Sequence, residues 1–187
     1  PSTAARTVTY QINDGTANSN TVTSTVNVTA VNDASTLATG STLNYTENGA
    51  ASPINAAITV ADLDNTTLPS ATVSITGGLA SAEDVLSFTN VPATMGNIAG
   101  VYNAATGVMT LTSAGGTATL AQWQAALRAV QYSNTSDNPS TSARTVTYQV
   151  NDGTANSNTV SSTVNVTSVN DAPVLATGST LGYTENG

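Results

Sequence analysis

The sequence predicts an all-β protein, an antiparallel β-sandwich of about seven to nine strands with one short helix. Two observations favour this fold class. Apolar residues alternate with Thr, Ser and Asn in many short runs, as at Val146, Tyr148 and Val150, which is the period of a half-buried strand. Gly, Asn, Asp and Pro separate these runs, and turn residues at such close intervals are typical of sandwiches.

Each predicted strand is based on this alternation. In chain order its apolar residues are Leu43 and Tyr45; Ile54, Ala56, Ile58 and Val60; Val73 and Ile75; Leu86 and Phe88; Met109 and Leu111; Val146, Tyr148 and Val150; and Val160, Val164 and Val166. The residues from Asn151 to Asn158 are turn formers. We therefore expect the last two strands to form a hairpin with a long loop.

Residues 119–132 break the alternation. Their apolar residues recur at helical spacing, namely Leu120, Trp123, Leu127 and Val130. Thr119, followed three residues later by Gln122, has the pattern of a capping box at a helix start. We expect one short helix around 119–130, with Trp123 packed into the core rather than serving as a ligand platform.

The chain repeats itself with a period of 138 residues, because residues 1–49 align without a gap on residues 139–187. Seven of the 49 pairs differ, all by mild exchanges: Ala4/Ser142, Ile12/Val150, Thr23/Ser161, Ala30/Ser168, Ser35/Pro173, Thr36/Val174 and Asn44/Gly182. This period has the size of a domain rather than of a solenoid unit. We predict the C-terminal hairpin of a preceding repeat over 1–33, one complete repeat over 34–171, and the first strand of the following repeat over 172–187.

The composition excludes several functions. The chain has 11 acidic residues against three arginines, no Lys, His or Cys, and a formal net charge of −8. Nucleic acid is not expected as a partner, because binding it needs a basic surface. No apolar run approaches the roughly 20 residues of a membrane span, so we expect none in this segment.

We also expect no enzyme, because His, Lys and Cys, which supply most general bases and nucleophiles, are missing. A glycosidase needs two carboxylates, and Asp62 with Asp64 are the candidates. These two lie in a predicted turn without an obvious group to position a substrate, which argues against this reading.

Most acidic residues stand where a predicted strand ends and a turn begins. Asp62 and Asp64 follow the strand that contains Val60, and Asp152 opens the hairpin loop. Several carboxylates at one junction repel each other unless a cation lies between them. Glu83 and Asp84 do not fit this pattern and are interpreted as a solvated face or loop.

Four short motifs occur in a characteristic order: "TEN" at 46–48, "VADLDN" at 60–65, "VNDG" at 150–153 and "VNDAP" at 169–173. Together they resemble the calcium motifs of cadherin-like repeats in very large bacterial surface adhesins. The resemblance covers the whole repeat, although each motif alone is short. It departs from the family in "SDNP" at 136–139, a loose match to the acidic motif before the penultimate strand, and in a shorter linker.

The resemblance implies Ca²⁺ bound at both ends of the central domain, through hard oxygen ligands. At one end the implied metal-binding residues are Asp62, Asp64 and Asp152, which would face the linker residues Asn32 and Asp33. At the other end the implied metal-binding residues are Glu47 and Asp137, which would face Asn170 and Asp171. The number of ions at each junction stays open.

These observations predict a non-catalytic spacer repeat of an extracellular adhesin or fibre, at a bacterial cell surface or secreted. Its partners would be neighbouring repeats of the same chain or fibre, and other modules would contact a host surface or a glycan. Two alternatives stay open. Exposed Thr and Asn on strands could bind carbohydrate or ice, or residues 1–33 could complete a neighbour's sheet by β-strand complementation in a fibre.

Overall fold

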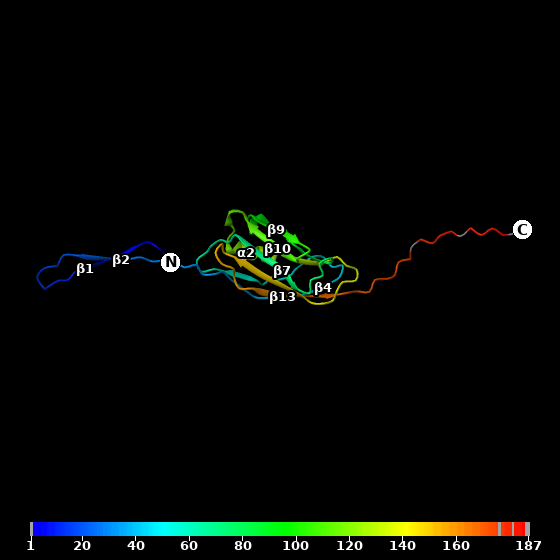
Figure 1. The fold of residues 1–187 in the computed structure, drawn as a ribbon, viewed down its shortest axis with the longest axis horizontal. Coiled ribbons are helices and arrows are strands. Elements are labelled where there is room, and N and C mark those ends of the chain that lie inside the picture. Colours follow the sequence, from blue (N-terminus) through cyan, green and yellow to red (C-terminus); the bar gives the residue numbers. More distant parts are fainter. Residues whose placement is uncertain (1, 176, 181, 186–187) are drawn as a thin grey trace.

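Six strands of alternating sequence form the larger sheet of the domain (Figure 1). The computed structural model describes residues 2–175, 177–180 and 182–185. In spatial order the strands are β4 (Thr42–Thr46), β13 (Val160–Thr167), β12 (Arg144–Asn151), β7 (Ser70–Gly77), β10 (Val108–Ser113) and β9 (Ile98–Asn103). Neighbouring strands are antiparallel except β4 and β13, which run parallel and depart from the predicted pattern.

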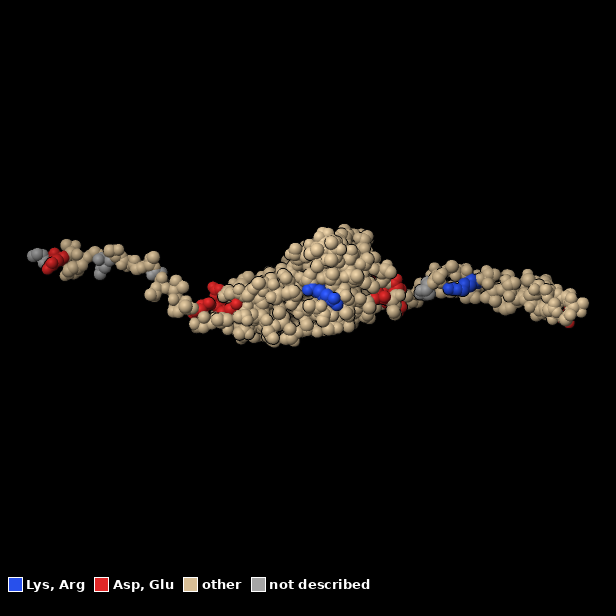
Figure 2. Space-filling view, turned by 180° about the vertical axis from the view of Figure 1, so that it is seen from behind, with Lys and Arg blue, Asp and Glu red and all other residues tan. Residues whose placement is uncertain are grey.

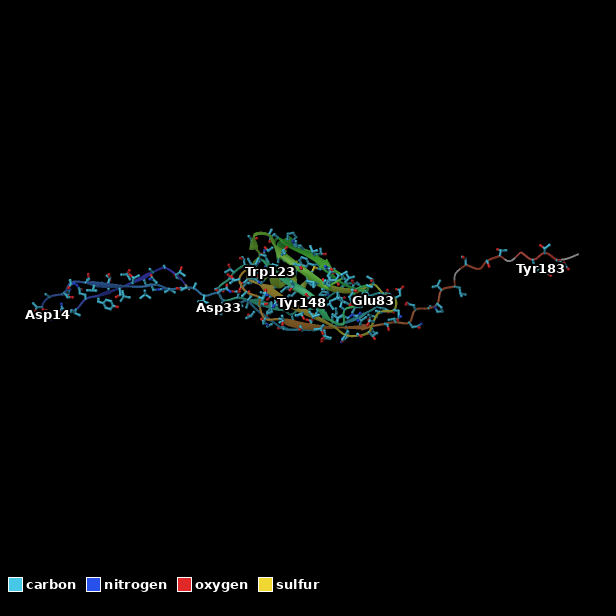
Figure 3. All side chains as sticks on the ribbon, in the orientation of Figure 1. Asp14, Asp33, Glu83, Trp123, Tyr148 and Tyr183 are labelled. Carbon is cyan, nitrogen blue, oxygen red and sulfur yellow. The ribbon has the colours of Figure 1, made fainter. Side chains whose placement is uncertain are left out.

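A second layer covers the inner face of this sheet. It consists of β5 (Ser52–Pro53), β11 (Gln131–Asn134) and β8 (Asp84–Ser87) in one sheet, β3 (Thr36–Ala38) and β6 (Thr59–Ala61) in another, and the helix α2 (Leu120–Arg128). Apolar side chains of both layers form one core, with Trp123 and Tyr148 inside it (Figure 3). The Tyr45 and Tyr132 rings meet edge to face across the layers, with centroids 5.2 Å apart. The protein is therefore the all-β sandwich that the sequence predicts.

The helix α2 confirms the predicted helix and its cap. The Thr119 side chain accepts from the Gln122 backbone N–H, and the Gln122 side chain accepts from the Thr119 N–H. Trp123 is fully buried, and its indole N–H donates to the Leu68 carbonyl oxygen at 2.8 Å. No helix in the described part of the chain is long and apolar enough to cross a membrane.

The structure contains elements that alternation alone does not predict. Of the expected strand over Ile54 to Val60, only the end is a strand, as part of β6, because β5 ends at Pro53. Between them lies a turn in which the Asn55 side-chain oxygen Oδ1 accepts from the Ala57 backbone N–H at 3.1 Å. The short helix α1 (Pro92–Met95), the 3₁₀ turn Ala114–Gly116, β9 and β11 were not expected. With its short strands, the central domain has more strands than predicted.

The first two strands, β1 (Arg6–Tyr10) and β2 (Val22–Val26), pair only with each other in a hairpin that extends from the domain (Figure 1). Its apolar residues Val8, Tyr10 and Val26 are exposed. Their copies in the central domain, Val146, Tyr148 and Val164, are buried. The described residues of 172–185 are exposed and form no strand, and residues 176, 181, 186 and 187 lie outside the described part. The repeat boundaries at 33 and 171 stay predictions.

Candidate metal sites at the two ends of the domain

Acidic side chains gather at both ends of the central domain, and most of its flank carries no charge (Figure 2). Asp33 and Glu83 lie at opposite ends, with the core between them (Figure 3). Within the described residues, no three Asp, Glu, His or Cys side chains are grouped so that they could hold a metal ion by themselves. A cation at either end would therefore need amide or backbone oxygens as well.

At the N-terminal junction, Asp62 organises the loop that follows β6. Its Oδ1 accepts hydrogen bonds from the backbone N–H groups of Asp64 at 3.0 Å and Asn65 at 2.7 Å. Its Oδ2 accepts from the Ser35 hydroxyl at 2.5 Å. The Asp-x-Asp spacing thus makes an Asx-type turn that holds the Asp62 carboxylate against the start of the domain.

The linker before the domain is attached to two acidic loops. Asp152 Oδ2 accepts from the Asn32 side-chain amide at 2.9 Å, while its Oδ1 accepts from the N–H groups of Thr154 and Ala155, both at 2.7 Å. Asp64 Oδ2 accepts from the Asp33 backbone N–H at 3.1 Å. All five residues expected at this end, Asn32, Asp33, Asp62, Asp64 and Asp152, therefore lie in one connected cluster.

The pKa values of two carboxyl groups show how this cluster is balanced. Burial acts to raise the pKa of Asp62, but hydrogen bonds from Ser35, Asn65 and Asp64 outweigh it, so the pKa lies below its usual value. The Asn32 amide and the Ala155 N–H lower the pKa of Asp152, and the nearby charge of Asp62 acts in the opposite direction. Both groups stay ionised at neutral pH, as a hard cation requires.

At the C-terminal junction, Glu47 follows β4 and is buried, with 5% of its surface exposed. Its N–H donates to the Thr167 carbonyl oxygen at 3.0 Å, and its Oε1 accepts from the Val169 N–H at 2.6 Å. Its Oε2 is buried and has no hydrogen-bond partner in the described residues. Glu47 therefore fixes the chain where it leaves the domain and keeps one carboxylate oxygen without a donor.

The structure does not join the other three expected residues to Glu47. Asn170 and Asp171 follow Val169 directly and are exposed, and the Asn170 amide donates to the Asp171 carbonyl oxygen at 3.2 Å. Asp137 is exposed in the loop after β11, and no hydrogen bond of its carboxylate is found in the described part of the chain. These three assignments stay predictions.

Sequence reasoning missed two residues of the N-terminal cluster, Ser35 and Asn65. The Asn65 amide donates to the Asn32 side-chain oxygen at 3.3 Å, beside the Ser35 bond to Asp62. Ser35 had a usable signal, because it is one of the seven positions at which the two copies differ. Asn65 directly follows the two aspartates, where a further oxygen ligand or turn residue is expected.

The interpretation of Asp84 as solvated was wrong. Asp84 is buried, with both carboxylate oxygens 3.1 Å from Arg144 Nε, and its Oδ1 accepts from the Tyr132 hydroxyl at 2.6 Å and the Asn134 amide at 3.1 Å. Arg144 Nη2 lies 3.0 Å from Oδ1 in ion-pair contact, without hydrogen-bond alignment. Neighbouring Glu83 is half-buried and accepts from the Ser140 N–H at 3.1 Å. The Asp84–Arg144 pair is structural, because Arg144 neutralises the buried charge of Asp84.

Comparison with known proteins adds one similarity. No family model matches the chain. Over 117 residues the sequence is 38% identical to Halomucin of Haloquadratum walsbyi. The matched stretch is 62% of this chain and 1% of Halomucin. The chain thus resembles a small part of a very long protein. The match does not test the cadherin-like resemblance.

Proposed function

We propose that this chain is a non-catalytic spacer repeat of an extracellular surface protein, and that Ca²⁺ at the junctions between successive repeats makes the array rigid. The observation that carries the proposal is the buried Glu47 Oε2 without a donor, at the point where the chain leaves the domain. A buried ionised oxygen without a partner is unfavourable. A hard cation satisfies it, and carboxylate oxygen is the ligand that Ca²⁺ prefers.

The N-terminal junction offers the matching half of such a site. Asp62, Asp64 and Asp152 supply carboxylate oxygens and Asn32 an amide oxygen, all within one hydrogen-bonded cluster. Ca²⁺ takes six to eight oxygens, and backbone carbonyls and water supply those that side chains do not. The donor set therefore fits a calcium ion and lacks the nitrogen and sulfur ligands that zinc prefers.

Charge explains how the ion would change the array. Without metal, carboxylates at a junction repel one another, and hydrogen bonds from Asn32 and Asp33 are what hold the short linker. With metal, the oxygens of the linker and of the domain bind one ion, which restricts the linker. Extracellular calcium modules have dissociation constants of about 10⁻⁴ to 10⁻³ M, which suits a millimolar environment.

Small-angle X-ray scattering on two successive complete repeats tests the proposal. We expect a longer and narrower distance distribution in calcium than in chelator. The double substitution Asp62→Asn with Asp64→Asn should remove this difference and should lower the melting temperature much more in calcium than in chelator. An unchanged maximum dimension in the parent protein, or equal losses of melting temperature in both conditions, contradicts calcium-stiffened junctions.

A second candidate function uses the outer face of the six-stranded sheet. Thr42, Thr163 and Thr145 lie in one row across β4, β13 and β12, and neighbouring strands are about 4.8 Å apart. Such regularly spaced hydroxyl groups favour binding of carbohydrate or ordered water on ice. A glycan array and an ice-shaping assay test it, and a negative result in both rejects this surface as an adhesive face.

A further inference from the structure

One flank of the domain is uncharged. From Val85 to Leu127 the sequence contains no Asp, Glu, Lys or Arg, although the chain has a net charge of −8. This segment supplies the neighbouring strands β9 and β10 and the helix α1. On the face that Figure 2 shows, the acidic residues lie at the two ends of the domain, and the body between them carries one basic patch and no negative charge. Neither the junctions nor the spacer role explains why this segment lacks charge.

Strand β9 presents a free sheet edge on this flank. It is the last strand of the six-stranded sheet and pairs with β10 from Ile98 opposite Ser113 to Asn103 opposite Val108. In the described part of the chain, the backbone groups of Ile98 to Tyr102 bond to no other element. Ala99, Gly100 and Val101 are consecutively exposed, Val101 to 73%.

The edge is rigid rather than frayed. A Cβ atom on Gly100 would lie 2.8 Å from Phe88 Cδ1 and 2.8 Å from Leu111 Cδ2, so the strand backbone packs directly against core side chains. Its pairing with β10 runs over six residue pairs without a register shift. The backbone N–H and C=O groups of the free side are therefore held in place for a further strand.

Natural proteins usually protect such an edge, and none of the common protections is present here. Charged side chains, proline, a bulge or a very short strand normally prevent pairing with another chain. The residues of β9, Ile-Ala-Gly-Val-Tyr-Asn, include neither a charge nor proline, and the strand is six residues long. An exposed edge strand without these protections is a candidate pairing site.

We propose that β9 pairs antiparallel with β9 of a second copy of this repeat, so that spacers associate side by side. A second copy fits because a two-fold axis through the edge lets the same strand serve both partners. The contact brings together two segments without charged residues, so no like charges face each other along β9. Ala99 and Val101 are small enough to let the backbones approach. The association does not depend on calcium and so goes beyond the spacer role.

Sedimentation equilibrium of the whole chain over a wide concentration range tests the proposal, in calcium and in chelator. We expect reversible dimers in both conditions. Val101→Lys places a charge on the edge at an exposed position and should weaken association at least about tenfold, without lowering the melting temperature. Thr42→Lys places the same charge on β4, the opposite edge, and should leave association unchanged.

A monomer at all concentrations overturns the proposal, and so does loss of association in Thr42→Lys or retention in Val101→Lys. Loss of association in chelator alone would assign the contact to the junctions instead.

Single cysteines locate the contact, because the chain has no cysteine of its own. Val101→Cys should form a disulfide-linked dimer under mild air oxidation much faster than Leu63→Cys, which is 88% exposed but lies at the N-terminal junction. Equal rates, or a faster Leu63→Cys, would place the contact elsewhere and overturn the β9 assignment.

Discussion

Arg144 donates from Nε to both carboxylate oxygens of Asp84 at 3.1 Å, and neither side chain is exposed to solvent. The pair joins the start of β12 to the start of β8. Arg144 Nη1 also donates to the carbonyl oxygens of Ser140 and Ser142, so the loop before β12 depends on the same side chain. Asp84 and Arg144 therefore fix how the last hairpin packs on the second layer.

Breaking this pair should be costly. Arg144→Met leaves the Asp84 carboxylate buried without its cation and should reduce the free energy of unfolding by about 3–5 kcal/mol. Arg6 is the copy of Arg144 in the exposed hairpin, so Arg6→Met is the matched control and should have almost no effect. Chemical denaturation measures both. Similar losses of unfolding free energy in the two variants would show that the buried Asp84–Arg144 pair does not contribute to stability.

Glu47→Gln tests the buried carboxylate at the C-terminal junction. The neutral side chain keeps the shape but removes a buried charge, so in chelator the melting temperature should stay the same or rise. In calcium the variant should lose the stabilisation that the parent chain gains. Differential scanning calorimetry in both conditions provides the comparison. A drop in melting temperature of equal size with and without calcium would mean that Glu47 acts only by holding Val169.

Asp152 and its copy Asp14 form a matched pair within one chain. Both carboxylates accept two backbone hydrogen bonds in the same loop, but only Asp152 also accepts from Asn32. Asp152→Asn should reduce calcium affinity several-fold in isothermal titration, whereas Asp14→Asn should not. Equal effects would mean that the loop itself, and not the junction, binds the ion.

Ser35→Pro introduces the residue that the following copy has at Pro173. It removes the hydroxyl that donates to Asp62 Oδ2, so that the pKa of Asp62 should rise toward its ordinary value. NMR titration of Asp62 in chelator measures this, and calcium titration then compares the two junction types. Ser35→Ala separates the lost hydroxyl from the effect of the proline ring. An unchanged Asp62 titration in Ser35→Ala would contradict the role of the hydroxyl.

Acid should release the linker. The pKa values of Asp62 and Asp152 lie below 3.8 in the folded chain, so their contribution to stability is fully present above pH 3.8 and is lost as the pH falls through the folded values. The NMR signals of the Asn32 side-chain amide in chelator should therefore shift only below pH 3.8. A shift at higher pH, or the same shift in Asp152→Asn, would show that another group controls the linker.

Local patterns predicted the parts of the fold that depend on neighbours in sequence. The capping box at Thr119 and Gln122 and the apolar face around Trp123 gave the helix, and alternation gave β7, β10, β12 and β13. The alternation over Ile54 to Val60 misled, because the buried Asn55 amide donates to the Thr39 carbonyl oxygen and supports a turn there. Gly100 concealed β9, since it interrupts the apolar pattern to make room for Phe88.

The candidate-site residues likewise divide into those that local sequence predicts and those that only the folded structure reveals. The cluster around Asp62 was predictable, because turn motifs and their order along the repeat place these residues at one end. Asp84 was not predictable, because its neutralising partner Arg144 is 60 residues away and only the fold brings them together. The unpaired Glu47 Oε2 was also not predictable, because its burial depends on the tertiary structure.

The parallel pairing of β4 with β13 decides how the domain would resist being stretched. The chain enters at one end through the short strand β3 and then β4, and it leaves at the other end through β13. Five residue pairs connect β4 and β13. Tension between the two termini pulls β4 and β13 in opposite directions along their length, so the hydrogen bonds are sheared together rather than unzipped one at a time. A tether built in this way holds under load until the whole ladder fails at once.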